Sequence, residues 1–362
     1  MATIEMTPAP TGARDERSLL PLLDEGKPSA RGWLARRIVQ GLVISGGLMV
    51  IAMDLPVIEP ARIARGLIYV IIGFSLHILL GYLGQISLGH QAFVGVGAFT
   101  SALLVTKGLT FWVAIFVSGA TGALAALVLG FVALRLRGLV LALVTFAYGQ
   151  VAEHSIFAIQ GLTGGAAGAT ALRPAGFAGD RAWAFLVAGF LAIMWLLDWR
   201  LVKSKAGRAI MTIRENEIAA ASFGINVVGY KILAFLLSGA IAGIGGALFA
   251  HNFEQVAPGD FSFQLALIIV LMVVVGGLGS RLGVFVGSMF FGIFPLAVPS
   301  DFVHHGDLIG ALLLLLTLTL FPGGIGQQLK PFTDWIAGHP FHFSLKPQRE
   351  SGISSGGAGV RP

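Results

Sequence analysis

The chain has 362 residues, of which 56% are hydrophobic and only 12% are charged, and its mean hydropathy is +0.84. Soluble globular domains carry about twice that proportion of charge, so the composition indicates a polytopic membrane protein. The sequence contains no cysteine, which excludes disulfide bonds, thiol catalysis and thiolate metal sites. The formal net charge is +6, but the basic residues are spread over loops rather than interleaved with aromatic residues, so they predict no nucleic-acid partner.

The apolar runs are long and do not alternate with polar residues, which favours membrane helices over a β-barrel. A helical span needs roughly 20 apolar residues. The predicted fold class is therefore an all-α polytopic membrane protein with about ten transmembrane helices, and eight or nine are the alternative counts. We expect the spans, in chain order, near residues 34–53, 66–83, 90–106, 111–134, 139–159, 182–197, 232–250, 263–276, 284–298 and 308–321.

The two ends of the chain differ from its apolar body, which we place at residues 33–326. Residues 1–32 mix Pro, Gly, Ser and charges of both signs without periodicity, and so does the chain from Ser344 onward, within a C-terminal tail that we place at residues 327–362. Such segments bury little apolar surface, so we expect a disordered N-terminal tail and a largely disordered C-terminal tail, both cytoplasmic. Acidic residues precede the first apolar run, which argues against a cleaved secretory signal.

The distribution of Lys and Arg predicts the orientation in the membrane. If the N-terminus is cytoplasmic, 19 of the 24 basic residues fall in cytoplasmic segments. The five on the other side are Arg62, Arg65, Lys107, Arg173 and Arg181. The positive-inside rule therefore places both termini in the cytoplasm, and the excess positive charge has a topological explanation.

Glycine and polar residues interrupt the apolar sequence after the second predicted span. The stretch GYLGQISLGHQAF, residues 81–93, places Gln85, Ser87 and His90 between two apolar runs. Backbone that is broken at membrane depth is tolerated mainly where it lines protein or a cavity. Elsewhere, Gly239 and Gly243 are spaced four residues apart within a span, which predicts close helix packing.

A second interruption is the long charged segment SKAGRAIMTIRENEIAAASFGINVVGYK, residues 204–231. Helix-forming residues lead to a charged cluster at Arg214, Glu215 and Glu217, and Gly224 and Asn226 provide a stop. This pattern predicts short amphipathic helices at the membrane surface, where they could meet a soluble partner. A solvated loop that only follows the charge bias of cytoplasmic loops explains the segment equally well.

Several ordered motifs together resemble the permeases of ABC importers for branched-chain amino acids, of the LivM kind. They are GQISLGH at 84–90, LTGG at 162–165, GRA at 207–209, IRENE at 213–217, KILAF at 231–235, SGAIAGIGGAL at 238–248, GGLGSRLG at 276–283 and FPGGIG at 321–326. The resemblance covers residues 66–326, and motifs in this order at matching separations are far more specific than any one of them.

The resemblance implies a permease subunit of the inner (plasma) membrane, in contact with lipid. Its implied partners are a second, LivH-like permease, two ABC ATPase subunits and a periplasmic or extracellular solute-binding protein. The chain has no G-x-x-x-x-G-K-[ST] loop for ATP, so ATP and Mg²⁺ are expected on the partner ATPases and no cofactor or enzymatic activity is expected in this chain. The paired His304 and His305 lie in a predicted outer loop, and we expect no metal site there.

The predicted function is translocation of branched-chain or related small amino acids. The predicted substrate-pathway residues are Gln85, Ser87, His90, Thr163, Gly164 and Gly165. The predicted ATPase-coupling residues, within residues 200–230, are Gly207, Arg208, Arg214, Glu215, Asn216, Glu217 and Gly224. Binding protein is expected to deliver solute at outer loops around residues 162–180 and 251–261.

Other functions remain open from the sequence alone. A self-sufficient secondary carrier or channel for a small polar solute is one, and a membrane scaffold without transport activity is another. Within the same family, urea, amides or small aromatic acids are alternative solutes. Glu153 is the one firm acidic residue inside a predicted span, where it acts either in transport or as a carboxyl group hydrogen-bonded between helices.

Overall fold

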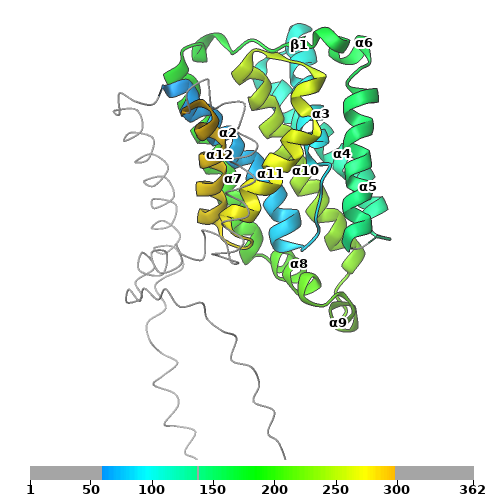
Figure 1. The fold of residues 1–362 in the computed structure, drawn as a ribbon. Coiled ribbons are helices and arrows are strands. Elements are labelled where there is room, and N and C mark those ends of the chain that lie inside the picture. The colour runs from blue at the N-terminus through cyan, green and yellow to red at the C-terminus, as the bar shows by residue number, and fades with distance from the viewer. Residues whose placement is uncertain (1–58, 137, 298–362) are drawn as a thin grey trace, which may run out of the picture. The chain divides into compact units, whose positions relative to one another are not determined.

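The computed structural model describes residues 59–136 and 138–297, all within one compact unit of the chain (Figure 1). Both predicted tails and the predicted spans near residues 34–53 and 308–321 lie outside the described residues. The first described helix is α2, Pro60–His77. The elements that follow are η3 Ile78–Tyr82, α3 His90–Thr106, α4 Phe111–Ala133, α5 Gly138–Val151, η4 Ala152–Ile156, α6 Gln160–Thr163, η5 Gly165–Ala167, β1 Ala169–Thr170, η6 Ala175–Phe177, α7 Asp180–Lys203, α8 Lys205–Glu215, α9 Glu217–Ser222, α10 Val227–Phe253, β2 Gln255–Val256, η7 Pro258–Phe261, α11 Phe263–Gly276 and α12 Arg281–Ala297.

Six helical stretches in the described part of the chain are long and apolar enough to cross a membrane. They are Pro60–Tyr82, Phe111–Ala133, Gly138–Ile156, Asp180–Lys203, Val227–Phe253 and Pro258–Gly276. Two shorter apolar helices, α3 and α12, occupy the places of two further predicted spans. The eight predicted spans from 66–83 to 284–298 therefore coincide with helices over their described residues, although α3 and α12 have only 17 residues each.

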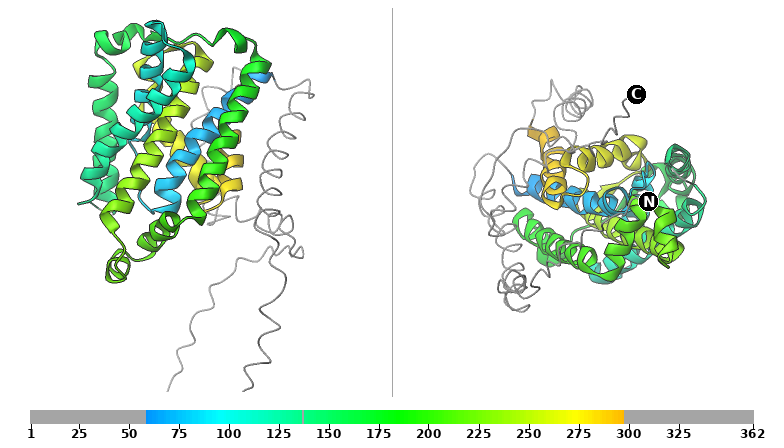
Figure 2. Two further views of the ribbon diagram at one scale, coloured as in Figure 1. Left: turned by 180° about the vertical axis from the view of Figure 1, so that it is seen from behind. Right: turned by 90° about the horizontal axis from the view of Figure 1, so that it is seen from below.

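Helix α2 is the central element of the described bundle. Its span is 94% buried, and it packs against α7, α10, α11 and α12 (Figure 2). A helix that is apolar all round and covered by protein on every side is the kind that forms the core of a large helical protein. Consequently, the fully buried polar side chains of α2, those of Ser75 and His77, lie in protein rather than in lipid.

Glycine brings α4 and α10 into close contact. A Cβ atom added to Gly122 on α4 would lie 2.8 Å from the Cα atom of Gly243 on α10, and one added to Gly239 would meet the Gly122 carbonyl. Gly97 on α3 faces Gly243 in the same way. The predicted role of Gly239 and Gly243 in close helix packing is thus confirmed.

The two ends of the described bundle are built differently (Figure 1). We call them the β1 end and the α8 end, after elements that lie there. At the β1 end, β1 pairs antiparallel with β2, with Ala169 opposite Val256. At the α8 end, α8 and α9 form a short helical pair between α7 and α10.

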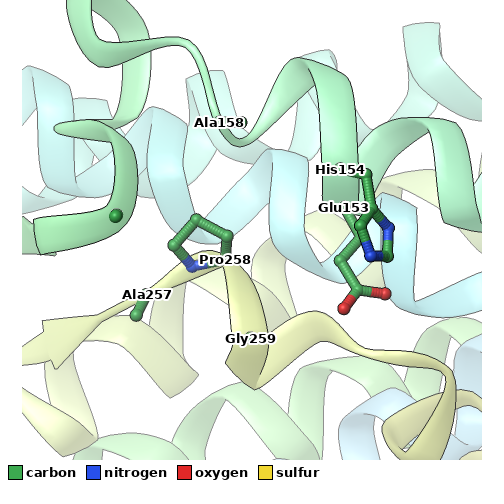
Figure 3. Close-up of a pocket in the computed structure, with 7 residues that line it drawn as sticks. Glu153, His154, Ala158, Ala257, Pro258 and Gly259 are labelled. Atoms are coloured by element: carbon green, nitrogen blue, oxygen red, sulfur yellow. The ribbon is translucent and has the colours of Figure 1, made fainter.

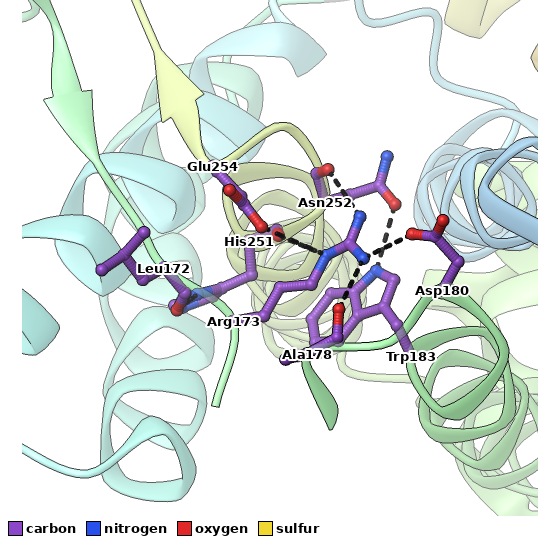
Figure 4. Close-up of polar contacts among 8 residues, drawn as sticks. All are labelled: Leu172, Arg173, Ala178, Asp180, Trp183, His251, Asn252 and Glu254. Atoms are coloured by element: carbon purple, nitrogen blue, oxygen red, sulfur yellow. Dashed lines mark hydrogen bonds and ion pairs between the residues drawn. The ribbon is translucent and has the colours of Figure 1, made fainter. Parts of the chain in front are cut away.

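Arg173 ties the loop after β1 to the end of α10 (Figure 4). Its guanidinium group pairs with the Asp180 carboxylate at 2.7 Å and donates hydrogen bonds to the main-chain carbonyl groups of His251 and Asn252. It also lies over the ring of Trp183, with its Cζ atom 5.5 Å from the ring centroid. Because its side chain is only 10% exposed, this cluster holds the β1 end together from within.

Candidate functional site

The chain re-enters the bundle between α2 and α3. Helix α2 ends in the π-helix η3, residues 83–89 are non-helical, and α3 begins at His90 inside the protein (Figure 1). We call residues 83–89 the re-entrant segment. Gly84 has a φ angle of +73°, a left-handed conformation that favours glycine, and it lies where the chain turns back. Short π-helices of this kind occur frequently at functional sites.

His77, the last residue of α2, packs against Gly81 of η3. A Cβ atom at residue 81 would lie 2.5 Å from His77 Nδ1, so only glycine leaves room for the imidazole ring. The ring is fully buried and packs edge-to-face against Tyr82, with centroids 4.6 Å apart. Neither ring nitrogen has a hydrogen-bond partner among the described residues.

His90 is fully buried at the start of α3 and is bonded to α2. Its Nε2 atom lies 2.6 Å from Ser75 Oγ, and Ser75 Oγ donates its single proton to the Ile72 carbonyl at 2.5 Å. The imidazole must therefore donate from Nε2, which leaves Nδ1 as an acceptor. Nδ1 is buried and has no partner among the described residues.

Four residues of this region bury polar atoms that have no partner in the described chain. The atoms are Gln85 Oε1, Ser87 Oγ, His90 Nδ1 and both amide atoms of Gln91. A buried polar group left unpaired costs about 1–3 kcal/mol, so such groups call for an explanation. Several such groups lie together on and beside one re-entrant segment, which makes this region the candidate functional site.

Helix α5 covers the re-entrant segment from one side. The Leu88 amide donates to Thr145 Oγ1 at 2.9 Å. A Cβ atom at Gly149 would lie 3.2 Å from the Cα atom of Gly89 and would overlap the Gln91 amide. The glycine pair thus allows the α5 backbone to pack directly on the segment, with the Gln91 side chain against it.

The structure separates the two predicted groups of pathway residues. Gln85, Ser87 and His90 lie at the re-entrant segment, whereas Thr163, Gly164 and Gly165 lie at the β1 end. Thr163 is 3% exposed, and its hydroxyl group contacts the carbonyl oxygens of Phe157 and Ile159 and accepts from the Gly165 amide. The hydrogen bonds of the Thr163 hydroxyl therefore stabilise its own loop. Gly164 and Gly165 adopt left-handed backbone conformations in that loop.

The charged segment after α7 folds as two short helices, as its sequence predicts. Ser204 caps α8 by accepting from the Gly207 amide, and Asn216 caps α9 by accepting from the amides of Ile218 and Ala219. Gly224 follows α9 with a φ angle of +76°. Both caps are side-chain types that favour helix starts.

Two of the three charged residues in the predicted coupling cluster bind within the chain. Arg214 Nη1 donates a hydrogen bond to the Gly81 carbonyl, and the Arg214 side chain packs where a Cβ atom of Gly84 would lie, 2.8 Å from Arg214 Cγ. Glu217 forms a 2.8 Å ion pair with Lys231, whose side chain is 3% exposed. Arg208 and Glu215 remain at the surface.

Two features of the site were not predicted from sequence. One is Gln91, which sits beside the recognised His90 and is fully buried. The other is a buried cluster in which Tyr82 Oη donates to Asp198 Oδ2 at 3.0 Å and Arg281 forms an ion pair with the same oxygen. A lone Asp at the end of an apolar run was the signal for the second, but its partners are distant in sequence.

No group of three or more His, Cys, Asp or Glu residues within residues 59–297 is placed to hold a metal ion. The candidate site consists of hydrogen-bonding side chains around the re-entrant segment, and the Arg214–Gly81 hydrogen bond joins it to α8. These groups offer hydrogen-bond donors and acceptors inside the described bundle.

Comparison with known proteins identifies the family of the chain. The family model for the branched-chain amino acid transport system permease component matches residues 62–318. The chain is 30% identical to the high-affinity branched-chain amino acid transport system permease protein LivM of Escherichia coli K12, over 81% of this chain and 78% of the relative. It is 32% identical to the nucleoside ABC transporter permease protein NupC of Lactococcus lactis, over 41% of this chain and 49% of the relative.

A third relative is the probable branched-chain amino acid transport permease protein LivH of Methanocaldococcus jannaschii, 31% identical over 38% of this chain and 47% of the relative. No solved structure shows a significant match. The family match spans both the re-entrant segment and the α8–α9 helices, and the hydrophobic helices are those of a multi-pass membrane protein. This chain belongs to the family of permease components of branched-chain amino acid transport systems.

Proposed function

We propose that the chain is the translocation subunit of an ATP-driven importer that carries branched-chain or related small amino acids across the inner membrane. The observation that carries this proposal is the contact between Arg214 on α8 and the backbone at Gly81, at the entrance of the re-entrant segment. This contact joins the surface helix α8, which an ATPase can reach, to the buried polar groups that would bind a solute. Family membership supplies the amino-acid class.

The solute pathway in this proposal passes the re-entrant segment. Gln85, Ser87, His90 and Gln91 offer polar atoms that have no partner among the described residues. Helix α3 starts here without a side-chain cap, so its positive N-terminal end favours a negatively charged group. The carboxylate of an amino acid can accept hydrogen bonds from the backbone amides at the start of α3 and from the side-chain amide of Gln91.

The ATPase contact in this proposal is the α8–α9 pair. Ile218 and Phe223 are 72% and 82% exposed, large apolar side chains beside exposed Arg208 and Glu215. Large exposed apolar side chains with charged residues around them are typical of a surface that binds another protein. Coupling passes from these residues through α8 and Arg214, with Gly207, Asn216 and Gly224 setting the helix ends.

The remaining subunits follow from the family. A second, LivH-like permease, two ATPases that bind ATP and Mg²⁺, and a solute-binding protein complete the importer. The α8 end faces the cytoplasm in this arrangement, because Lys and Arg are concentrated there, and both chain termini are cytoplasmic. The binding protein then meets the β1 end, where Thr163, Gly164 and Gly165 shape an outer loop.

Reconstitution of the purified complex in vesicles tests the proposal. We expect uptake of radiolabelled leucine that requires internal ATP, the binding protein and both permeases. Uptake that proceeds with this chain alone and without ATP would instead identify a secondary carrier. Calorimetry on the partner binding protein, with leucine, a nucleoside and urea as probes, identifies the solute class that it delivers.

Phe223→Ser tests the ATPase contact separately. The substitution removes an apolar side chain that is 82% exposed, so the helical bundle should melt at an unchanged temperature. Loss of one apolar anchor at an interface typically costs about 1–2 kcal/mol or more, so ATPase co-purification and uptake should both fall by about tenfold. Retained co-purification and uptake would exclude this surface as the ATPase contact.

A further inference from the structure

An open cavity of about 440 Å³ lies at the β1 end, away from the re-entrant segment (Figure 3). The residues that line it are Glu153, His154, Ala158, Ala166, Ala257, Pro258 and Gly259. They come from η4 at the end of α5, from the loop that contains Gly164 and Gly165, and from the turn that precedes α11. Cavities of about 300–1,000 Å³ commonly hold small molecules.

The π-helix η4 fixes the position of Glu153. Helix α5 ends in this π-turn, which closes with a 2.8 Å hydrogen bond from the Phe157 amide to the Ala152 carbonyl. Phe157 is buried between Phe99 and Phe261, with ring centroids 5.0 and 5.8 Å away, so the turn is anchored to the bundle. Figure 3 shows the Glu153 carboxylate between α5 and the turn at Gly259.

Glu153 is half-buried and forms no hydrogen bond or ion pair within the described chain. No Lys or Arg is among the described residues that line the cavity. The neighbouring His154 ring is held by its own helix, through a 3.2 Å hydrogen bond from Nδ1 to the Gln150 carbonyl. A carboxylate that is partly withdrawn from water and has no counter-ion is an unused partner for a cation.

The rest of the lining is small and apolar. Ala158, Ala166, Ala257 and Pro258 present methyl and methylene groups around the single carboxylate. This combination suits a molecule that carries one ammonium group next to a short aliphatic chain. It does not suit an anion, because the cavity would hold two negative charges together.

We propose that this cavity is a recognition site for the ammonium group of an amino-acid solute, with Glu153 as the counter-ion. The proposal rests on the proposed transport function and deepens it, because the solute meets Glu153 at the β1 end before it reaches the re-entrant segment. Glu153 then selects solutes with a free amino group, whereas the start of α3 meets their carboxylate.

A reporter thiol measures the charge in the cavity. Because the sequence has no cysteine, Ala166→Cys places a single thiol of this chain in the lining. The assembled complex in lipid discs is treated with a cationic or an anionic methanethiosulfonate, and modification is followed by the mass of this chain. Glu153→Gln should lower the ratio of cationic to anionic rates about fivefold or more, because a unit charge a few ångströms away is removed.

Glu59→Gln is the matched control. Glu59 lies at the same end of the bundle, is 74% exposed and pairs with Arg62 at 3.4 Å, outside the cavity. Its removal changes the net charge equally and should leave the rate ratio unchanged. An equal fall in both variants would show a general surface potential and overturn the inference. Ala158→Cys, which also lines the cavity, replaces the reporter if Ala166→Cys does not assemble.

Protection by small molecules identifies the group that binds. Leucine and isopentylamine should slow the modification of Ala166→Cys, whereas 4-methylpentanoate, which lacks the amino group, should not. Glu153→Gln should raise the half-protecting leucine concentration at least about tenfold, the loss expected for one charge-assisted hydrogen bond. Equal protection by 4-methylpentanoate, or leucine protection that survives Glu153→Gln, would overturn the inference.

Uptake measurements keep this proposal distinct from the proposed function. If the wild-type complex takes up no leucine but leucine still protects the reporter through Glu153, transport of leucine is excluded and the cation site remains. If the complex takes up leucine and neither labelling nor protection depends on Glu153, the transport function stands and the cation site is excluded.

Discussion

The fully buried amide of Gln91 gives the sharpest test at the scale of single residues. Both of its amide atoms lack a partner in the described chain, so its burial does not stabilise the fold. Leucine is similar in size, and replacing an unpaired buried polar group by an apolar one is neutral or stabilising by up to about 1–3 kcal/mol. Gln91→Leu should therefore keep or raise the melting temperature of the purified complex.

Transport by Gln91→Leu should nevertheless fall by about tenfold, because one hydrogen bond to a solute is worth about 1.4 kcal/mol. Gln85→Leu, within the re-entrant segment itself, should also lower transport. Melting followed by intrinsic fluorescence and leucine uptake are measured on one preparation. A lower melting temperature with a proportionate loss of uptake would show that the amide bridges helices and does not contact the solute.

Glu217 requires an experiment that takes its ion pair with Lys231 into account. Because it pairs with Lys231, whose side chain is 3% exposed, Glu217→Gln or Glu217→Arg leaves an ammonium group buried without this counter-ion. Breaking a buried ion pair from one side costs about 3 kcal/mol, so instability would hide any effect on coupling. The double variant Glu217→Gln with Lys231→Met removes both charges and should recover most of that stability.

Uptake by the double variant then decides the role of Glu217. If the pair is structural, the double variant should transport at a rate close to the wild type. If Glu217 contacts the ATPase, as the sequence predicts, the double variant should melt normally and fail to stimulate ATP hydrolysis. Comparing the single variants with the double variant separates the stability lost by breaking the ion pair from the loss of an ATPase contact.

At the scale of elements, Arg214 connects α8 to η3 and the re-entrant segment. Arg214→Ala removes the hydrogen bond to the Gly81 carbonyl and the side-chain packing on Gly84. We expect ATP hydrolysis and assembly to persist while leucine uptake falls at least about tenfold, because movement of α8 no longer reaches the segment. Gly84→Ala should resemble it, since its Cβ atom would lie 2.8 Å from Arg214 Cγ.

Thr212→Ala is the control on the same helix. Thr212 is exposed, and its hydroxyl group donates to the Arg208 carbonyl at 2.9 Å within α8. It should therefore leave the ratio of transport to ATP hydrolysis unchanged. A joint loss of ATP hydrolysis and transport in Arg214→Ala would place Arg214 at the ATPase surface instead. Normal transport by that variant would exclude the connection.

Most of the helices could be predicted from the sequence, and a comparison of their predicted and observed ends shows which features of the sequence determine them. The predicted span 90–106 coincides with α3, because the polar run before His90 and the Lys-Gly pair after Thr106 mark its ends. Helix α7 extends beyond its prediction to Lys203, since basic residues at a helix end are tolerated where they reach the interface. The π-helices η3 and η4 have no such signal, because they depend on how distant side chains pack.

At the scale of the whole molecule, close backbone contacts hold the described bundle together. Gly122→Ala would place a Cβ atom 2.8 Å from the Cα atom of Gly243, where backbone cannot yield, so α4 must move from α10. We expect a fall in melting temperature and a loss of about 1–3 kcal/mol, the usual cost of overpacking. Gly189→Ala on α7 is the matched control, because nothing lies within 4 Å of its Cβ atom.

Gly189→Ala should be neutral or stabilising by up to about 1 kcal/mol, the difference in helix propensity between the two residues. Thermal melting of both variants in one detergent checks the comparison. Equal melting temperatures would mean that the α4–α10 contact is less close than the structure has it.

The candidate site was only partly predictable at this scale. Interrupted apolar sequence identified Gln85, Ser87 and His90, because a break in a span is a local property of the chain. It grouped them with Thr163, Gly164 and Gly165, which lie at the β1 end, because sequence does not give depth in the bundle. The Asp198–Arg281 pair and the Arg214–Gly81 contact join residues 83 and 133 positions apart, which a single sequence does not reveal.

The acceptor of the Arg214 hydrogen bond is a main-chain oxygen, and this has a consequence for natural variation. Every amino acid at position 81 would offer the same carbonyl group, so no substitution there can remove the acceptor chemically. Only the room beside His77 restricts the residue to glycine. Second-site revertants of Arg214→Ala should therefore arise on α8 or on the ATPase, and not at Gly81.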